Sequence, residues 1–245
     1  MTRQTLRKKP LNTSDRLATN LNDVRTRLAE ACLRRQRDPA DVRLIAVTKS
    51  ARVEWIRELI ALGQHDLAEN RPQQLCQRAG ELPSAAHWHM IGHLQRNKVE
   101  QLWPVVQWIH AVDSLRLMNR ITEVAAKLPG EHGPQVLLEV NISGEASKEG
   151  FTPQELLAHW PELHSVAATR IVGLMTMAPY TDDANVIRPV FRGLRELRDR
   201  LVELCGGKLM LPELSMGMSG DFEIAAEEGA TMVRVGSRLF EGLDT

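Results

Sequence analysis

Short apolar runs alternate along most of this chain with segments in which apolar residues recur at helical spacing. The predicted strands are Val42–Val47, His65–Ala68, Trp88–Ile91, Trp108–Val112, Val136–Asn141, Ile171–Met175, Glu213–Ser215 and Met232–Val235. Several are continuous apolar runs, which is typical of parallel strands covered on both faces. The pattern therefore predicts an α/β protein built on a parallel sheet.

The segments between the strands carry helix signals. Four apolar residues form one helical stripe ahead of the first strand: Leu17, Leu21, Val24 and Leu28. Thr13 or Ser14 is the expected cap of this helix. The run from Thr152 to Glu155 has the residues of a capping box. A long helix is predicted near Asn185–Leu204, with an apolar stripe of Val190, Leu194, Leu197, Leu201 and Leu204.

Eight strands alternating with helices, at roughly 27 residues per unit, match a (β/α)₈ TIM barrel, whose usual length is about 250 residues. A doubly wound open sheet is the alternative, because alternation alone does not prove closure of the sheet. No linker-like stretch divides the 245 residues. We expect a flexible tail over residues 1–12 and one barrel domain over residues 13–245, with an extra N-terminal helix.

Composition narrows the class of protein. The chain has 31 basic and 31 acidic residues, so no overall field favours nucleic acid or an anionic membrane as a partner. No apolar run approaches the length of a membrane span. Cys32, Cys76 and Cys205 are far apart and odd in number, which indicates reduced thiols and a cytoplasmic location. The basic residues 1–10 predict a solvated tail, with a transit peptide as the alternative.

Lys49 stands two residues beyond the first predicted strand, on the loop that leads into a helix. In a barrel, chemistry is placed at the carboxyl ends of the strands, and phosphate is commonly bound by the loops after strands seven and eight. Here those loops contain Ser215, Gly217 and Ser219, and the pair Gly236-Ser237. Taken alone, Lys49 is more simply a solvated or ion-paired surface lysine, and a Gly-Ser pair is commonly only a turn.

Together, an amine and a phosphate site at one barrel mouth fit an aldehyde that carries a phosphate, and pyridoxal 5′-phosphate (PLP) is such a cofactor. Its ring nitrogen needs a facing acid or arginine. Arg234 lies within the last strand and could serve if its side chain points inward.

Two other features suggest alternatives. His87, His89 and His93 lie close together in the sequence, but with no carboxylate at ligand spacing nearby we expect no metal site. The segment Glu145–Gly150 follows the fifth strand and is either a loop that closes over the site or a passive connection. Lys148 within it could reach the phosphate.

At these positions the chain resembles the pyridoxal phosphate homeostasis protein family, whose barrel is of the alanine racemase N-terminal kind (fold type III of PLP enzymes). The resemblance covers nearly the whole chain after the tail. The segments that carry it are LIAVTKS, AENRPQQL, WHMIGHLQRNKV, IHAVDS, LLEVNISGEASKEGF, IVGLMTM and SMGMSGDFEIAAEEGATMVRVGS. Two positions depart from the family pattern, Ala68 and Glu241, and they leave local loop shapes open.

The resemblance implies that Lys49 forms an aldimine with PLP and that Arg234 faces the ring nitrogen. It also implies a phosphate site made by Ser215 with Gly236 and Ser237. Four further residues are implied to lie near the cofactor or line its pocket: Asn70, His89, Ile91 and Met177.

An arginine at the ring nitrogen disfavours ring protonation, so the ring becomes a poorer electron sink. Two-base racemisation also needs a second base, which related racemases take from a tyrosine of another domain. This chain ends at Thr245 soon after the predicted barrel and contains one tyrosine, Tyr180. We therefore expect a monomeric, non-enzymatic protein that stores, buffers or delivers PLP, with apo PLP-dependent enzymes as recipients. The alternatives are a weak amino-acid racemase and, from another class, a phosphate-sugar enzyme with a Schiff-base lysine.

Overall fold

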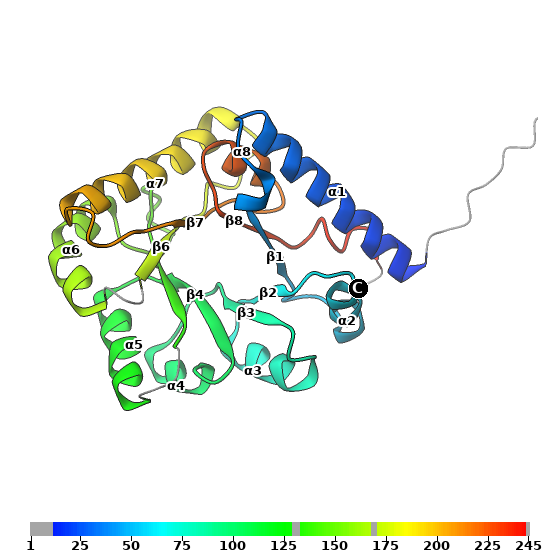
Figure 1. Ribbon diagram of the computed structural model, residues 1–245, viewed down its shortest axis with the longest axis horizontal. Helices are drawn as coiled ribbons and strands as arrows, with labels where there is room; N and C mark the ends of the chain where they lie inside the picture. The colour runs from blue at the N-terminus through cyan, green and yellow to red at the C-terminus, as the bar shows by residue number, and fades with distance from the viewer. Residues whose placement is uncertain (1–11, 129–132, 168–170, 244–245) are drawn as a thin grey trace, which may run out of the picture.

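The computed structural model describes residues 12–128, 133–167 and 171–243. Its eight strands form a closed barrel in chain order, and every neighbouring pair is parallel (Figure 1). The strands are β1 (Arg43–Val47), β2 (Asp66–Glu69), β3 (His87–Met90), β4 (Val106–Val112), β5 (Gln135–Glu139), β6 (Ile171–Met175), β7 (Glu213–Ser215) and β8 (Met232–Val235). This confirms the predicted barrel and excludes the open sheet.

Helices surround the barrel (Figure 1). They are α1 (Thr13–Leu33), α2 (Val53–Ala61), α3 (Pro72–Glu81), α4 (Val99–Leu102), α5 (Leu115–Lys127), α6 (Pro153–Ala167), α7 (Ala184–Leu204) and α8 (Phe222–Glu227), with 3₁₀ turns η1 (Pro39–Asp41) and η2 (Arg96–Lys98). The predicted capping box of α6 is present, because Thr152 and Glu155 exchange side-chain and backbone hydrogen bonds of 2.8–3.1 Å. No helix of the described residues is long and apolar enough to cross a membrane.

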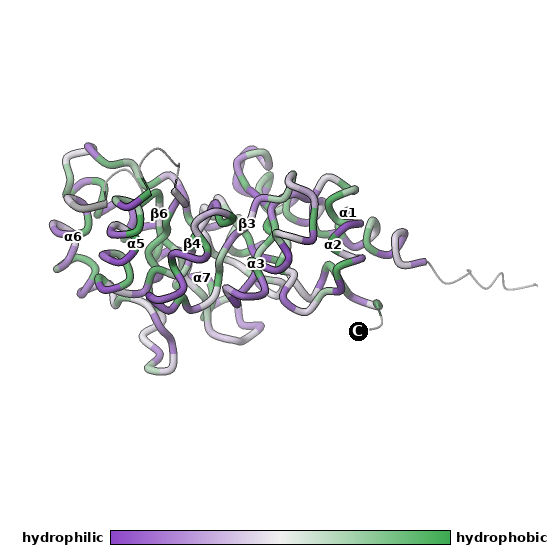
Figure 2. Tube along the Cα trace, turned by 90° about the horizontal axis from the view of Figure 1, so that it is seen from below, coloured by the Kyte–Doolittle hydropathy of each residue, from purple (hydrophilic) through white to green (hydrophobic). Residues whose placement is uncertain are grey.

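The core has two parts. A small cluster fills the barrel interior with Ile45, Ala68, Trp108, Ala111, Leu137, Met175 and Met232. A much larger cluster lies between the strands and the helices, and it includes the four-residue stripe predicted for α1. Figure 2 shows the surrounding helices alternating between hydrophobic and hydrophilic residues, as expected of helices with one face on the core. Burial on both faces explains why the strands read as continuous apolar runs.

Some predicted details are wrong. The cap of α1 is Asn12, whose side chain accepts a hydrogen bond from the backbone N–H of Asp15, and not Thr13 or Ser14. Leu204, predicted as part of the apolar stripe of α7, is 59% exposed because the helix ends there, beyond the barrel wall. Apart from Asn12, the tail predicted over residues 1–12 lies outside the described residues.

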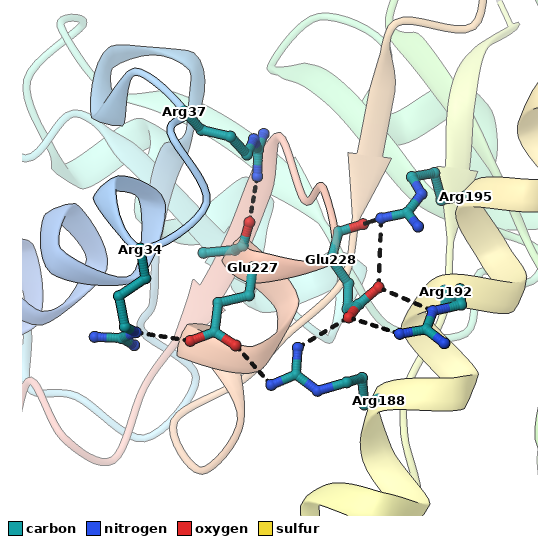
Figure 3. Close-up of polar contacts among 8 residues, drawn as sticks. Arg34, Arg37, Arg188, Arg192, Arg195, Glu227 and Glu228 are labelled. Carbon is teal, nitrogen blue, oxygen red and sulfur yellow. Dashed lines mark hydrogen bonds and ion pairs between the residues drawn. The ribbon is translucent and has the colours of Figure 1, made fainter.

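Helix α1 packs against α8, so the first helix covers the seam between the last strand and the first (Figure 1). Charged contacts join these elements to α7 (Figure 3). Glu228, only 3% exposed, pairs with Arg188, Arg192 and Arg195 at 2.9–3.4 Å. Glu227 pairs with Arg188 at 2.6 Å and with Arg34, the residue that caps the end of α1, at 2.8 Å.

Candidate functional site

The parallel strands bring the predicted site residues toward one end of the barrel. Lys49 follows β1, Asn70 follows β2, Ile91 follows β3 and Met177 follows β6. Ile91 and Met177 are partly buried and pack on the interior cluster. They therefore form its edge at the carboxyl ends of the strands, which we call the barrel mouth.

The loop that carries Lys49 is held by α3. Arg78 donates hydrogen bonds to the carbonyl oxygens of Thr48 at 2.6 Å and Ala51 at 2.7 Å. Gln74 donates to the carbonyl oxygen of Lys49 itself at 3.0 Å. The lysine side chain is exposed, while its backbone is fixed on both sides.

Arg78 also forms a buried ion pair with Glu69, and this pair ties β2 to the same loop. Glu69 is fully buried and accepts a second hydrogen bond from the Thr48 hydroxyl at 2.5 Å. Burial raises the pKa of Glu69, although the hydrogen bond from Thr48 and the charge of Arg78 act in the opposite direction.

Arg234 points into the barrel, as its proposed role requires. Its side chain is 4% exposed and donates to the Ser215 hydroxyl at 2.5 Å and to the carbonyl oxygen of Thr176 at 3.0 Å. Burial lowers the pKa of the guanidinium to about 10, and the nearby charges of Glu139 and Asp221 partly oppose this shift. The Arg234 guanidinium, which can only donate hydrogen bonds, is thus held in the barrel interior below the mouth.

Ser215 does not lie where a phosphate-binding role would put it. It is fully buried, and its hydroxyl contacts Arg234 and the Nδ1 atom of His110 at 2.8 Å. The hydroxyl that meets the β8 loop belongs to Ser219, which accepts a hydrogen bond from the backbone N–H of Gly236 at 3.1 Å. Ser219 stands in the polar turn that the sequence pattern singled out after β7, whereas the resemblance implied Ser215 as the phosphate residue.

His89 also lies deeper than a pocket-lining role suggests. It is fully buried, stacks on Trp108 with ring centroids 5.6 Å apart, and contacts His110 and Asp66. Asn70 is held from its other side by Gly92, where a Cβ atom would lie 2.4 Å from the Asn70 carbonyl oxygen. Only glycine permits this approach of the β3 loop to the β2 loop.

The segment Glu145–Gly150 belongs to a loop with anchored ends. Val140 and Phe151 form a parallel bridge that returns the chain to β5. The Lys148 ammonium donates to the carbonyl oxygen of Met177 at 3.1 Å and pairs with Glu145 at 3.1 Å. These contacts tie the loop after β5 to the segment that follows the neighbouring strand β6.

No carboxylate lies at ligand spacing from the histidines in the sequence, but the fold brings two to His93. Its Nδ1 atom is 3.1 Å from Asp113 and 3.2 Å from Glu149, and these three residues follow β3, β4 and β5. Ligand atoms of the three lie within 4.8 Å of one another. The sequence could not show this, because strand pairing brings the loops together. The side chains of His93 and Glu149 are more than half exposed, so we interpret the cluster as a group of surface ion pairs.

Glu139 ends β5 close to the same charges. Burial raises its pKa to about 7, against the attraction of Arg234 and with a further contribution from Asp113 and Glu149. A carboxyl group that titrates near neutrality therefore stands beside the buried guanidinium.

Two cavities of about 480 Å³ each open at the opposite, amino-terminal end of the barrel, and they share Arg43, Asp66 and His87. None of the residues predicted to hold the cofactor lines them. The amine, the guanidinium and the small-residue loops all lie toward the carboxyl ends of the strands, which favours the mouth as the candidate site.

Comparison with known proteins identifies the family of the chain. Residues 14–244 match the family model described as the alanine racemase N-terminal domain. The chain is 39% identical over 221 residues to the pyridoxal phosphate homeostasis protein of Aquifex aeolicus, covering 90% of this chain and 95% of that one. It is also 39% identical over 230 residues to the protein of that name from Pseudomonas aeruginosa, covering 93% and 96%.

Among solved structures, PipY of Synechococcus elongatus PCC7942 is 35% identical, both without PLP (TM-score 0.80) and with PLP bound (TM-score 0.79). In both cases the match covers 91% of this chain and 99% of PipY. An alanine racemase of Clostridium difficile 630 is 19% identical with a TM-score of 0.74, over 94% of this chain and 58% of the racemase, which shows a shared fold.

Proposed function

The chain belongs to the alanine racemase N-terminal domain family and, within it, to the pyridoxal phosphate homeostasis proteins, and on this premise we propose that it binds PLP at the barrel mouth. The single observation that carries the proposal is a fixed lysine loop, an inward guanidinium and two small-residue loops at one end of one barrel. PipY, solved with PLP bound, supports it. When bound, the cofactor supplies an aldehyde, and the Lys49 amine is the group we assign to its covalent attachment.

For the phosphate we propose Ser219, Gly236 and Ser237, in place of the triad with Ser215. The Gly236 N–H donates to the hydroxyl oxygen of Ser219, so the loops after β7 and β8 meet there and the Ser219 O–H is left to donate to an anion. A Cβ atom on Gly236 would lie 3.3 Å from Val47, a tight contact, so glycine best keeps this backbone open to an anion. The donors thus fit a phosphate group.

We assign Arg234 to the ring nitrogen. A cation at that position disfavours ring protonation and makes the bound ring a weak electron sink. Tyr180, the one tyrosine of the chain, is fully exposed, so it is not oriented into the mouth as a second base. Both points support holding, buffering or delivering the cofactor without robust turnover of amino acids.

One observation favours the alternative of a weak PLP-dependent racemase. Glu139 is buried beside Arg234 with a pKa of about 7, which suits a group that exchanges protons at neutral pH. In that reading, Lys49 and Glu139 would be the two proton-transfer groups.

The test is PLP titration of the purified protein, followed by the visible absorbance of lysine-bound PLP. Lys49→Ala should abolish that band with the fold retained, whereas Lys208→Ala, an exposed lysine beyond α7, should keep it. Retention of the band in Lys49→Ala would refute the assignment. Incubation with each amino acid, followed by chiral analysis, separates the two functions, since efficient turnover would favour the racemase.

We further propose a cytoplasmic, monomeric carrier that passes PLP to apo PLP-dependent enzymes. The thiols of Cys32, Cys76 and Cys205 are free in the structure, in keeping with a reducing compartment.

A further inference from the structure

A continuous chain of polar side chains runs through the barrel interior below Arg234. Ser215 contacts His110 at 2.8 Å, and His110 contacts His89 between ring nitrogens at 2.9 Å. All three are fully buried, and we call them the relay. Arg234 contacts one end of the relay at 2.5 Å, and Asp66 contacts the other end at 3.1 Å. The relay therefore joins the candidate cofactor site to the amino-terminal end of the barrel.

The chemistry of the two ends fixes the direction of every hydrogen bond. The Asp66 carboxylate only accepts, so His89 must carry its proton on Nε2 and accept at Nδ1. His110 must then donate from Nε2 to His89 and accept at Nδ1. The Ser215 hydroxyl donates to that atom, which leaves its oxygen to accept from Arg234, a group that only donates. With both histidines neutral, this is the one arrangement that satisfies each group.

Both histidines meet the condition of neutrality. Burial lowers the pKa of His89, although its hydrogen bond to Asp66 opposes the shift. Burial lowers the pKa of His110 well below its usual value, and the charges around it add to the effect. At neutral pH neither ring therefore carries a second proton that would reverse a donor in the relay.

The Asp66 end meets the charges of the neighbouring strands. Its side chain is 23% exposed and lies 3.9 Å from Arg43 on β1 and 3.6 Å from His87 on β3. Burial would raise the pKa of Asp66, but the hydrogen bond from His89 and the charge of Arg43 hold the pKa below its usual value. The relay thus ends in a stable carboxylate on the wall shared by the two amino-terminal cavities.

Arg234 makes no ion pair with a carboxylate within the described part of the chain. Its hydrogen-bonded link to a negative charge is the relay, in which each bond polarises the next in a low-dielectric interior. We propose that Asp66 is a positioning residue for Arg234, and that it acts through the three side chains between them. This inference rests on the proposed function. Its consequence is that Asp66, at the far end of the barrel, fixes the position of the guanidinium that faces the PLP ring.

The first experiment needs no cofactor. Histidine ¹⁵N NMR of the apoprotein should show His89 and His110 neutral at pH 7, each with its proton on Nε2. A proton on Nδ1 of either ring, or a charged ring, would overturn the arrangement.

The second experiment compares variants. Asp66→Asn removes the charge, and its amide offers either a donor or an acceptor, so the histidines should become tautomer mixtures and the side-chain NMR signals of Arg234 should shift. Ser215→Ala cuts the relay next to Arg234 and should shift the same signals. Glu213→Gln is the matched control, because it removes a carboxylate at the first residue of β7, at the same end of the barrel but outside the relay.

PLP retention measured on these variants completes the test. Asp66→Asn and Ser215→Ala should each retain PLP on the order of fivefold more weakly, and their double variant no more weakly than the worse single, since both break one chain. Glu213→Gln should stay within about twofold. Fully additive losses, or equal losses in Glu213→Gln, would overturn the proposal. A wild-type protein that retains no PLP would instead refute the proposed function and leave the NMR result to decide on the relay.

Discussion

Replacing Arg78 with methionine tests how much the anchoring of the Lys49 loop contributes to stability and to PLP retention. The change leaves Glu69, which is fully buried, without its cation. It also removes the donors at 2.6 and 2.7 Å from the carbonyl oxygens of Thr48 and Ala51. Breaking one side of a buried ion pair costs about 3–5 kcal/mol, because the remaining charge is stranded. We therefore expect Arg78→Met to lower the free energy of unfolding by about that amount.

The double variant Glu69→Gln/Arg78→Met separates stability from loop position. With no stranded charge, and with a side-chain oxygen still able to accept from Thr48, it should regain most of the loss. The two loop carbonyls still lack their donors, so a deficit of about 1–2 kcal/mol should remain. PLP retention should stay weakened even though the fold has recovered.

Urea denaturation followed by circular dichroism measures the free energies, and PLP absorbance measures retention. Arg57→Met is the matched control, because Arg57 is exposed and donates to one carbonyl oxygen at the end of α3, that of Glu81. It should cost less than about 0.5 kcal/mol. A loss below about 1 kcal/mol in Arg78→Met, or normal PLP retention in the double variant, would refute the reasoning.

Three further predictions concern the mouth. The pKa of Glu139 rises from 4.5 to about 7 on folding, so its contribution to stability is full below pH 4.5 and is lost as pH rises through 7. Relative to Glu139→Gln, the wild type should lose about 3 kcal/mol of unfolding free energy between pH 4 and 8, measured by urea titration. Parallel stability curves for the two proteins would contradict this. Ser219→Ala should weaken PLP retention by on the order of 1–2 kcal/mol at equilibrium dialysis, and unchanged retention would move the phosphate elsewhere. Gly92→Ala should lower the melting temperature, since its Cβ would lie 2.4 Å from the Asn70 carbonyl oxygen, whereas Gly80→Ala in open space on α3 should not.

The barrel was predictable because a strand buried on both faces needs apolar residues at successive positions, and such runs are visible in the sequence. The last three strands have the predicted bounds, while β2 extends to Glu69 and β4 begins at Val106. Glu69 was placed outside the strand because it is charged. Its burial is possible because it pairs with Arg78, which lies nine positions away on another element. Strand ends of this kind are decided by tertiary contacts that no local pattern carries.

The candidate site was predictable where chain order suffices, as for Lys49 beyond β1 and Gly236 beyond β8. It was not predictable where the position of a residue along the barrel axis matters. Ser215 and Ser219 are both serines near the end of β7, but Ser215 lies inside the barrel and Ser219 lies at its mouth. The relay was missed for the same reason. A polar residue within an apolar strand, such as His110, is the available signal, but its partners depend on strand register.

The contact between α1 and α8 bears on how the chain folds. The two helices lie far apart along the chain, yet they pack together, and β8 pairs with β1 beneath them. Contacts between residues distant in sequence form slowly, because the long loop between them must be closed first. We therefore expect the packing of α1 on α8 and the pairing of β8 with β1 to be late events in refolding.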